Sequence, residues 1–194
     1  RGAAVPGRLP PRGAHRPAAA ADAPAADELT ALKKTLIVAG VVVACLAAAL
    51  VVLRLVGLEP RERWPGLWLT GQVVTTPVSD WSFTDRYPTI AVQTRSWYGL
   101  PHSVTVTCTA LDGRLYLTSV YPPGLEFPRD RRWNRNVIRD PHVRLKIGTQ
   151  VYDRTLALVT DPAEKDAVLA AKAKKYPRQT AVDKTRVHVS RVGP

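Results

Sequence analysis

Residues 103–120, SVTVTCTALDGRLYLTSV, contain two alternating segments on either side of the turn dipeptide Asp112-Gly113. Before the turn, valine and cysteine alternate with threonine, and after it leucine alternates with polar or aromatic residues. Such alternation places the apolar side chains on one face of a strand. Asp-Gly favours a two-residue hairpin turn because both positions accept a positive φ. The stretch therefore predicts an antiparallel hairpin with one buried face.

Segments on both sides of this hairpin add further strands and two helices. The remaining expected strands are 67–75, 89–94, 143–147, 151–159 and 186–192. Of these, 143–147 and 151–159 are expected to form a second hairpin around Gly148-Thr149. Residues 131–139 fit a short helix, and a second helix starts at Asp161, with Pro162 in its first position and Glu164 in its third. About seven antiparallel strands with two short helices predict a mainly-β (α+β) barrel domain over residues 59–194.

An uninterrupted apolar run of 18 residues, Leu36–Leu53, lies between the Lys33-Lys34 pair and Arg54. As a helix it would be about 27 Å long, close to the roughly 30 Å hydrocarbon core of a bilayer. We expect one transmembrane helix within residues 29–58. The alternatives are a buried core helix, which seldom runs so long without a polar residue, and a lipoprotein signal cleaved before Cys45.

Small residues recur every four positions in this run, at Gly40, Ala44 and Ala48. Such a stripe lets two helices approach closely in lipid and predicts a partner interface, whereas the alternative is a lipid-exposed anchor. Basic residues flank the run almost equally, and the further arginines of the N-terminal arm favour a cytoplasmic N-terminus with the domain on the opposite side. Residues 1–28 form an arm rich in Pro, Ala and Arg that we expect to be disordered alone.

The chain is basic, with 28 Lys and Arg against 16 Asp and Glu and a net charge of +12. This balance favours contact with a lipid bilayer or an acidic partner. No nucleic-acid partner is predicted, because no helix-turn-helix, zinc pattern or aromatic RNA-binding motif is found. The two cysteines and four histidines are dispersed, so that no metal site is predicted, and no catalytic motif is recognised.

Short motifs around and after the hairpin occur in a characteristic order. They are Thr94-Arg95, residues 99–102, Asp112-Gly113, and residues 115–119, 131–137, 140–143 and 188–194. In combination they resemble the split β-barrel flavoprotein superfamily, which includes pyridoxamine-phosphate-oxidase-like and deazaflavin-dependent nitroreductase-like proteins. The resemblance covers about residues 68–194 and implies a split-barrel fold.

The resemblance also implies an FMN or F420 cofactor, usually bound at a homodimer interface. Carried over by position, the residues on the phosphate side of the cofactor would be Arg95, Thr118, Ser119, Arg131 and Arg132. Guanidinium groups and hydroxyls are suitable donors for phosphate oxygens. The alternative is that these are surface arginines and strand hydroxyls that bind no cofactor.

The segment after the hairpin departs from the family pattern. Residues 120–128 contain three prolines and a glycine, and the nearby acids Glu126 and Asp130 would oppose a phosphate. We expect Tyr121, Leu125 and Phe127 to be exposed there and to form a partner surface.

Two functions follow from these patterns. The first is a single-pass membrane-anchored accessory subunit of a larger membrane protein complex, which uses a reductase-like barrel for docking, without catalysis and without a cofactor. The alternative is a membrane-tethered flavin- or deazaflavin-dependent oxidoreductase.

Overall fold

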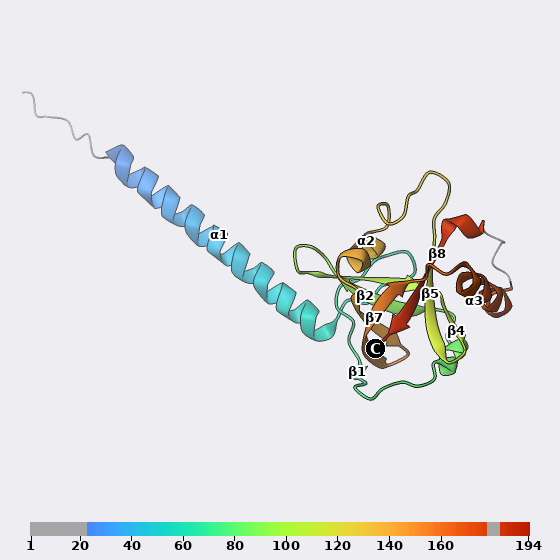
Figure 1. Cartoon of the computed structure of the whole chain (residues 1–194). Helices are drawn as coiled ribbons and strands as arrows, with labels where there is room; N and C mark the ends of the chain where they lie inside the picture. Colours follow the sequence, from blue (N-terminus) through green and yellow to red (C-terminus); the bar gives the residue numbers. More distant parts are fainter. Residues whose placement is uncertain (1–22, 178–182) are drawn as a thin grey trace, which may run out of the picture. The chain divides into compact units, whose positions relative to one another are not determined.

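The computed structural model describes residues 23–177 and 183–194, and it divides into two compact units with their boundary between Ala47 and Ala48. Most of the arm predicted over residues 1–28 lies outside the described residues. Helix α1 spans Ala23–Val56 (Figure 1) and so begins before the expected position 29. Its most apolar window has a mean hydropathy of 3.1, and none of that window is buried among the described residues. The helix is therefore long and apolar enough to cross a bilayer.

The second unit contains one sheet in which seven strands follow the spatial order β3-β2-β6-β7-β8-β5-β4. Neighbouring strands on this path are antiparallel. The strands are β1 (Gln72–Val73), β2 (Ile90–Arg95), β3 (Pro101–Val106), β4 (Cys108–Leu111), β5 (Arg114–Val120), β6 (His142–Ile147), β7 (Gln150–Leu158) and β8 (Val187–Gly193).

One continuous segment supplies both edges of this sheet. Strands β3 and β4 follow each other in the chain, separated by Thr107, yet β3 pairs with β2 at one edge and β4 pairs with β5 at the other. The segment therefore closes the sheet on itself, and the expected split barrel is confirmed. The single strand expected over residues 103–111 is in fact broken at Thr107, because the segment changes pairing partner there.

The predicted hairpins are confirmed. Asp112 and Gly113 have φ values of 50° and 73°, as a type I′ turn requires. Cys108 pairs with Leu117, which puts the alternating apolar residues of both strands on the same face. The second hairpin joins β6 to β7.

The strand expected over 67–75 is reduced to the two residues of β1. These residues run parallel to β7, so that the expectation of antiparallel pairing was wrong for this strand.

The apolar face of the sheet encloses the main core. Its largest members are the rings of Trp81, Trp133 and Tyr152, packed with aliphatic side chains from β2, β5, β6 and β8. The face of β5 that points outward contributes Tyr116 to a smaller cluster with Val168 and Val189. This second cluster seats helix α3 on the outer face of the barrel.

The two predicted helices of the domain are present as α2 (Arg132–Arg139) and α3 (Pro162–Lys175), with short 3-10 helices at Ser82–Arg86 and Lys184–Arg186. The Asp161 carboxylate caps α3 by accepting hydrogen bonds from the backbone N–H groups of Ala163 and Glu164. The Glu164 carboxylate accepts from Tyr116 at 2.8 Å and pairs with Arg191 at 3.0 Å, and so ties α3 to the barrel.

Candidate functional site

Three of the five predicted cofactor residues line one groove. Thr118 and Ser119 lie near the end of β5, and Arg131 immediately precedes α2. The groove has a volume of about 390 Å³, and its other walls come from β3 and from the segment around Trp64. Strand β5 and helix α2 therefore bring together hydroxyl groups and a guanidinium, as an anion site requires.

The Thr118 hydroxyl is the centre of a small polar cluster. It lies 3.0 Å from the Thr107 hydroxyl and accepts a hydrogen bond of 2.6 Å from the Lys172 ammonium on α3. Lys172 forms no ion pair with a carboxylate of the described residues. Burial lowers the pKa of this ammonium, because the charged form loses solvation. An anion in the groove would therefore find an uncompensated positive charge behind Thr118.

Ser119 is held by a different contact. Its buried hydroxyl accepts a hydrogen bond of 2.7 Å from the Asn134 side chain, and the same amide donates to the Tyr121 hydroxyl at 2.6 Å. Tyr121 is only 2% exposed, so the expectation that its side chain is exposed was wrong. The ring is buried because Asn134 supplies a partner for its hydroxyl. Burial raises the pKa of Tyr121.

Arg131 joins the groove to the following loop. Its Nη2 donates to the Val120 carbonyl at 2.6 Å, and its guanidinium lies 5.3 Å from the centre of the Tyr121 ring. Its Nε is buried and has no hydrogen-bond partner among the described residues. A buried donor without a partner costs free energy. The Arg131 residue lines the groove, but this atom is itself covered by the surrounding protein.

Arg95 and Arg132 do not line this groove. Both side chains are exposed. Arg95 contributes instead to a separate basic hollow of about 500 Å³ beside β6 and β7. Arg132 lies near His102, whose pKa is lowered first by burial and then by the positive charge of Arg132. The five residues predicted as one phosphate site therefore separate into a group of three and two exposed arginines.

The acids expected to repel a phosphate are absent from the residues that line the groove. Glu126 and Asp130 both pair with Arg129, at 3.2 Å each, and the Asp130 carboxylate also accepts the Glu126 N–H. In the same loop Leu125 is 43% exposed, whereas Phe127 is half-buried and stacks on His188. Of the three residues expected to form an exposed partner surface in this loop, only Leu125 has an exposed side chain.

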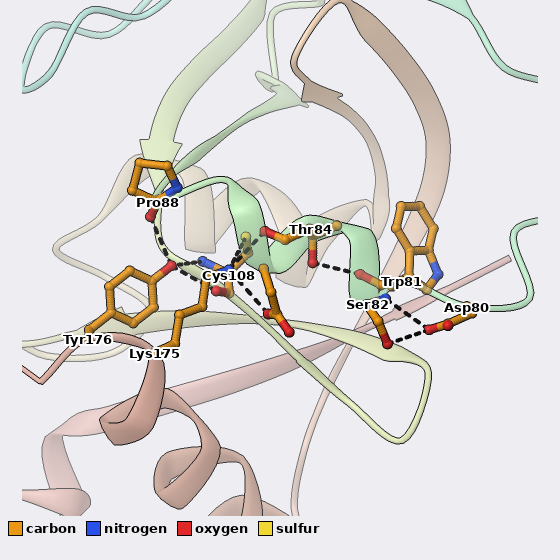
Figure 2. A network of polar contacts seen from close by, with 9 residues as sticks. Asp80, Trp81, Ser82, Thr84, Pro88, Cys108, Lys175 and Tyr176 are labelled. Atoms are coloured by element: carbon orange, nitrogen blue, oxygen red, sulfur yellow. Dashed lines mark hydrogen bonds and ion pairs between the residues drawn. The ribbon is translucent and has the colours of Figure 1, made fainter.

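A second polar network, for which no sequence pattern gave a signal, lies at the β3–β4 break (Figure 2). Lys175 and Tyr176, at the end of α3, point toward the buried Cys108. The Lys175 ammonium lies 3.6 Å from the Cys108 sulfur, 3.5 Å from an Asp85 carboxylate oxygen and 2.9 Å from the Thr84 carbonyl. Burial raises the pKa of the Cys108 thiol, so that this cysteine is a weak nucleophile.

Tyr176 completes this network. Its hydroxyl lies 2.8 Å from the carbonyl oxygens of Pro88 and Cys108 and accepts the Cys108 N–H at 3.3 Å. The hydroxyl thus satisfies backbone groups that the strand break leaves without ladder partners. We assign the network a structural role, because its members bond to one another and to the backbone.

Among the described residues that line the groove, Glu62 is the one carboxylate. Over residues 23–177 and 183–194, no set of three or more His, Cys, Asp and Glu side chains is placed to bind a metal ion. The groove offers hydroxyls, the guanidinium groups of Arg63 and Arg131 and the nearby Lys172 ammonium, which can bind and orient an anion, whereas the Glu62 carboxylate opposes one. Redox chemistry at such a place would come from a bound cofactor.

Comparison with known proteins found neither a matching family model nor a matching curated protein. Solved structures with similar folds include a candidate pyridoxamine 5′-phosphate oxidase from Listeria innocua, with 20% identity, a TM-score of 0.44, and coverage of 58% of this chain and 88% of that one. An F420-H2 dependent reductase has 20% identity, a TM-score of 0.40, and coverage of 55% and 94%. A NimC/NimA family protein from Clostridium acetobutylicum has 14% identity, a TM-score of 0.43, and coverage of 57% and 74%.

These proteins are of the split-barrel group that the sequence motifs resemble. With identities of 20% or less and TM-scores below 0.5, no cofactor, substrate or partner of this chain follows from these likenesses. The closed strand order described above defines the class of this chain, a split β-barrel preceded by a long apolar helix.

Proposed function

We propose that this chain is a single-pass membrane-anchored accessory subunit whose barrel serves as a docking scaffold in a larger membrane protein complex, without catalysis. The observation that carries the proposal is the internal bonding of the residues expected to hold a cofactor. The Ser119 hydroxyl is engaged by Asn134, and the Thr118 hydroxyl by Thr107 and Lys172.

A cofactor phosphate would have to replace these contacts. The Asn134 amide bridges Ser119 and Tyr121 while both are buried. Breaking a buried hydrogen bond and leaving one partner unsatisfied costs about 1–3 kcal/mol. The internal contacts therefore favour a barrel that is stable without a ligand, as a scaffold must be.

The proposed anchor is α1, with its mean hydropathy of 3.1 over the most apolar window. Within it, a Cβ atom built on Gly40 meets no atom within 4 Å, so that nothing in the described structure prevents a partner helix from approaching that position. Ala44 and Ala48 continue the same stripe. We assign the stripe to the partner helix and the exposed Leu125 to a second contact on the barrel. A cytoplasmic N-terminus is part of the proposal.

Two measurements test this function. After alkaline carbonate washing of membranes, the chain should remain in the pellet, and its release would overturn the anchor. In mild detergent, the chain should purify colourless together with other membrane subunits. Gly40→Leu should reduce this association, whereas the control Val42→Leu, on the opposite side of the helix, should leave it unchanged. Equal association of the two variants would contradict the stripe.

The groove favours a second candidate function, a membrane-tethered oxidoreductase that uses FMN or F420, with homodimerisation through the barrel. The Arg131 guanidinium, which lines the groove, and Lys172, which donates to Thr118 from behind it, would hold the cofactor phosphate. The bound cofactor would supply the hydride chemistry. Purification with a stoichiometric yellow flavin would support this function and exclude the scaffold without a cofactor.

A further inference from the structure

The loop between β2 and β3 exposes aromatic side chains at its tip. Trp97 is 82% exposed, and Tyr98 and Leu100 are exposed beside it. Two backbone hydrogen bonds close the loop, from Gly99 to Ser96 and from Ser96 to Leu100, and the φ of +84° at Gly99 allows the chain to turn there. The tip is therefore an ordered turn that presents two rings outward.

The two rings contact each other, and their polar atoms form no hydrogen bond with the described residues. Trp97 and Tyr98 pack edge to face, with ring centres 5.3 Å apart. Neither the indole N–H nor the phenol hydroxyl has a hydrogen-bond partner among the described residues. Tryptophan and tyrosine in this state are typical of the membrane interface, where the ring meets apolar lipid and the polar atom meets the headgroups.

A second exposed tryptophan lies in the segment that follows α1. Trp64 is 79% exposed and closes a tight turn with Arg61 through two backbone hydrogen bonds of 2.8 and 3.0 Å. The turn also carries Arg63 and Glu62. None of the arginines at positions 61, 63 and 95 forms an ion pair with a carboxylate of the described residues, although the pKa of Asp140 is lowered by its hydrogen bond with His142 and, to a smaller extent, by the charge of Arg95. Their guanidinium groups can contact anionic headgroups.

Chain connections place both tryptophans near the C-terminal end of α1. Leu58, two residues beyond that end, exchanges backbone hydrogen bonds with Leu67 and Trp68. Gly66 pairs in turn with Ser103 of β3. Leu100 immediately precedes β3 and lies three residues from Ser103, or about 10 Å along the extended chain. The headgroup layer on each side of a bilayer is about 5–8 Å thick, so the short connection from α1 allows this edge of the barrel to reach the lipid surface if α1 spans the membrane.

We propose that Trp64 and the 97–100 loop form a lipid-docking edge, which inserts into the headgroup region beside the point where α1 leaves the bilayer, with Arg61, Arg63 and Arg95 against anionic phospholipids. The inference rests on the proposed function in one respect, because α1 must span the membrane. Contacts of Trp64 and of the 97–100 loop with lipid, added to the α1 anchor, would fix the orientation of the barrel on the membrane surface. The residues of the barrel that contact partner subunits would then face a defined direction.

Fluorescence of the full chain in vesicles tests this edge. The chain is reconstituted in phosphatidylcholine vesicles with phosphatidylglycerol, and its tryptophan emission is compared with that in vesicles of brominated lipids, which quench nearby rings. Trp97→Phe should lower the quenched emission by roughly half, because one of the two interfacial indoles is removed. The control Trp133→Phe removes a ring that is 5% exposed and should leave the quenched emission unchanged.

Each result identifies which claim fails. If the chain resists carbonate washing but Trp97→Phe leaves the quenched emission unchanged, the docking edge is wrong and the anchor stands. If carbonate releases the chain, the proposed function itself fails. Quenching that is equal with and without phosphatidylglycerol, or unchanged by Arg63→Gln with Arg95→Gln, would overturn the role of the arginines.

Discussion

Gly66 and Ser103 exchange two backbone hydrogen bonds, of 2.9 and 3.0 Å, which attach the segment after α1 to the outer edge of β3. The pair covers part of a strand edge that would otherwise present unpaired backbone groups. It also makes the connection between α1 and the barrel an ordered part of the domain.

Gly66→Ala should destabilise this connection. A Cβ atom there would contact the Leu58 carbonyl oxygen and would lie 2.6 Å from both the Pro60 nitrogen and the Ser103 hydroxyl. Two of these three atoms belong to the backbone and cannot rotate away. We expect a loss of about 1–3 kcal/mol in the free energy of unfolding, measured by denaturant titration in detergent. Ser103→Ala, which removes a buried hydroxyl without a partner, should be close to neutral and should not rescue Gly66→Ala.

Asn134→Ala should lower stability by removing one donor group from two buried hydroxyls. Ser119 and Tyr121 would both lose their contact with the amide, at a cost of about 1–3 kcal/mol for each unsatisfied group. A thermal melt of the purified chain measures the effect. Ile138→Ala on the same helix, at a side chain that is 56% exposed, is the matched control and should shift the melting temperature much less. Equal shifts would show that the amide bridge contributes nothing.

Local patterns predicted the hairpins and the start of α3 because each depends on neighbours in the chain. The Asp112-Gly113 turn requires two positive φ values, and the cap of α3 requires Asp161 next to Pro162. Alternation likewise predicted which face of β5 is buried. The break at Thr107 could not be predicted in this way, because alternation continues through it and the exchange of pairing partners is a property of the whole sheet.

The site was predicted only where one element supplied the residues. Thr118 and Ser119 lie on one strand and do line the groove, whereas the burial of Tyr121 depends on Asn134, which reaches it from α2. Lys175 meets Cys108 across 67 positions of sequence, and neither residue carries a local signal for that contact. Contacts between segments that are distant in the sequence therefore could not be predicted from local patterns.

Tyr176→Phe should loosen the attachment of α3 at the strand break. The Cys108 N–H loses its acceptor, and the Pro88 and Cys108 carbonyls lose the single proton that the hydroxyl can donate to one or other of them, so that local opening becomes more frequent. In a Cys45→Ser background, the only remaining thiol is Cys108, which is fully buried. Maleimide should label it slowly in the parent and faster in Tyr176→Phe. The control Tyr98→Phe alters an exposed ring and should not change the rate; if it does, the assignment of the network is wrong.

His188 should make the chain less stable in acid. Burial first, and then the charge of Lys165, lowers its pKa below the ordinary 6.5. Between the lowered value and 6.5 the unfolded chain binds more protons, so that the free energy of unfolding falls as pH decreases, by at most about 1.4 kcal/mol per pH unit for one group. Above 6.5 this contribution to stability is fully present.

Denaturant titrations at a series of pH values below and above 6.5 measure this dependence. His188→Asn should flatten the curve below 6.5, and His102→Asn should flatten it further, because burial lowers the pKa of His102 as well. A curve of unchanged slope in the double variant would assign the acid sensitivity to other groups.

Lys172→Met distinguishes an anion-binding groove from a purely structural one. The ammonium contacts only Thr118 among the described residues, and burial lowers its pKa, so that the charge has no counterion to offset its desolvation. If phosphate or FMN binds beside Thr118, the anion should stabilise the parent chain by mass action and raise its melting temperature. Lys172→Met should lose most of that increase, whereas Lys174→Met, at a neighbouring exposed position of α3, should keep it. If the chain is a scaffold, neither ligand shifts the melting temperature of the parent. Lys172→Met is then at least as stable as the parent at neutral pH, because it removes a partly buried charge at the loss of one hydrogen bond.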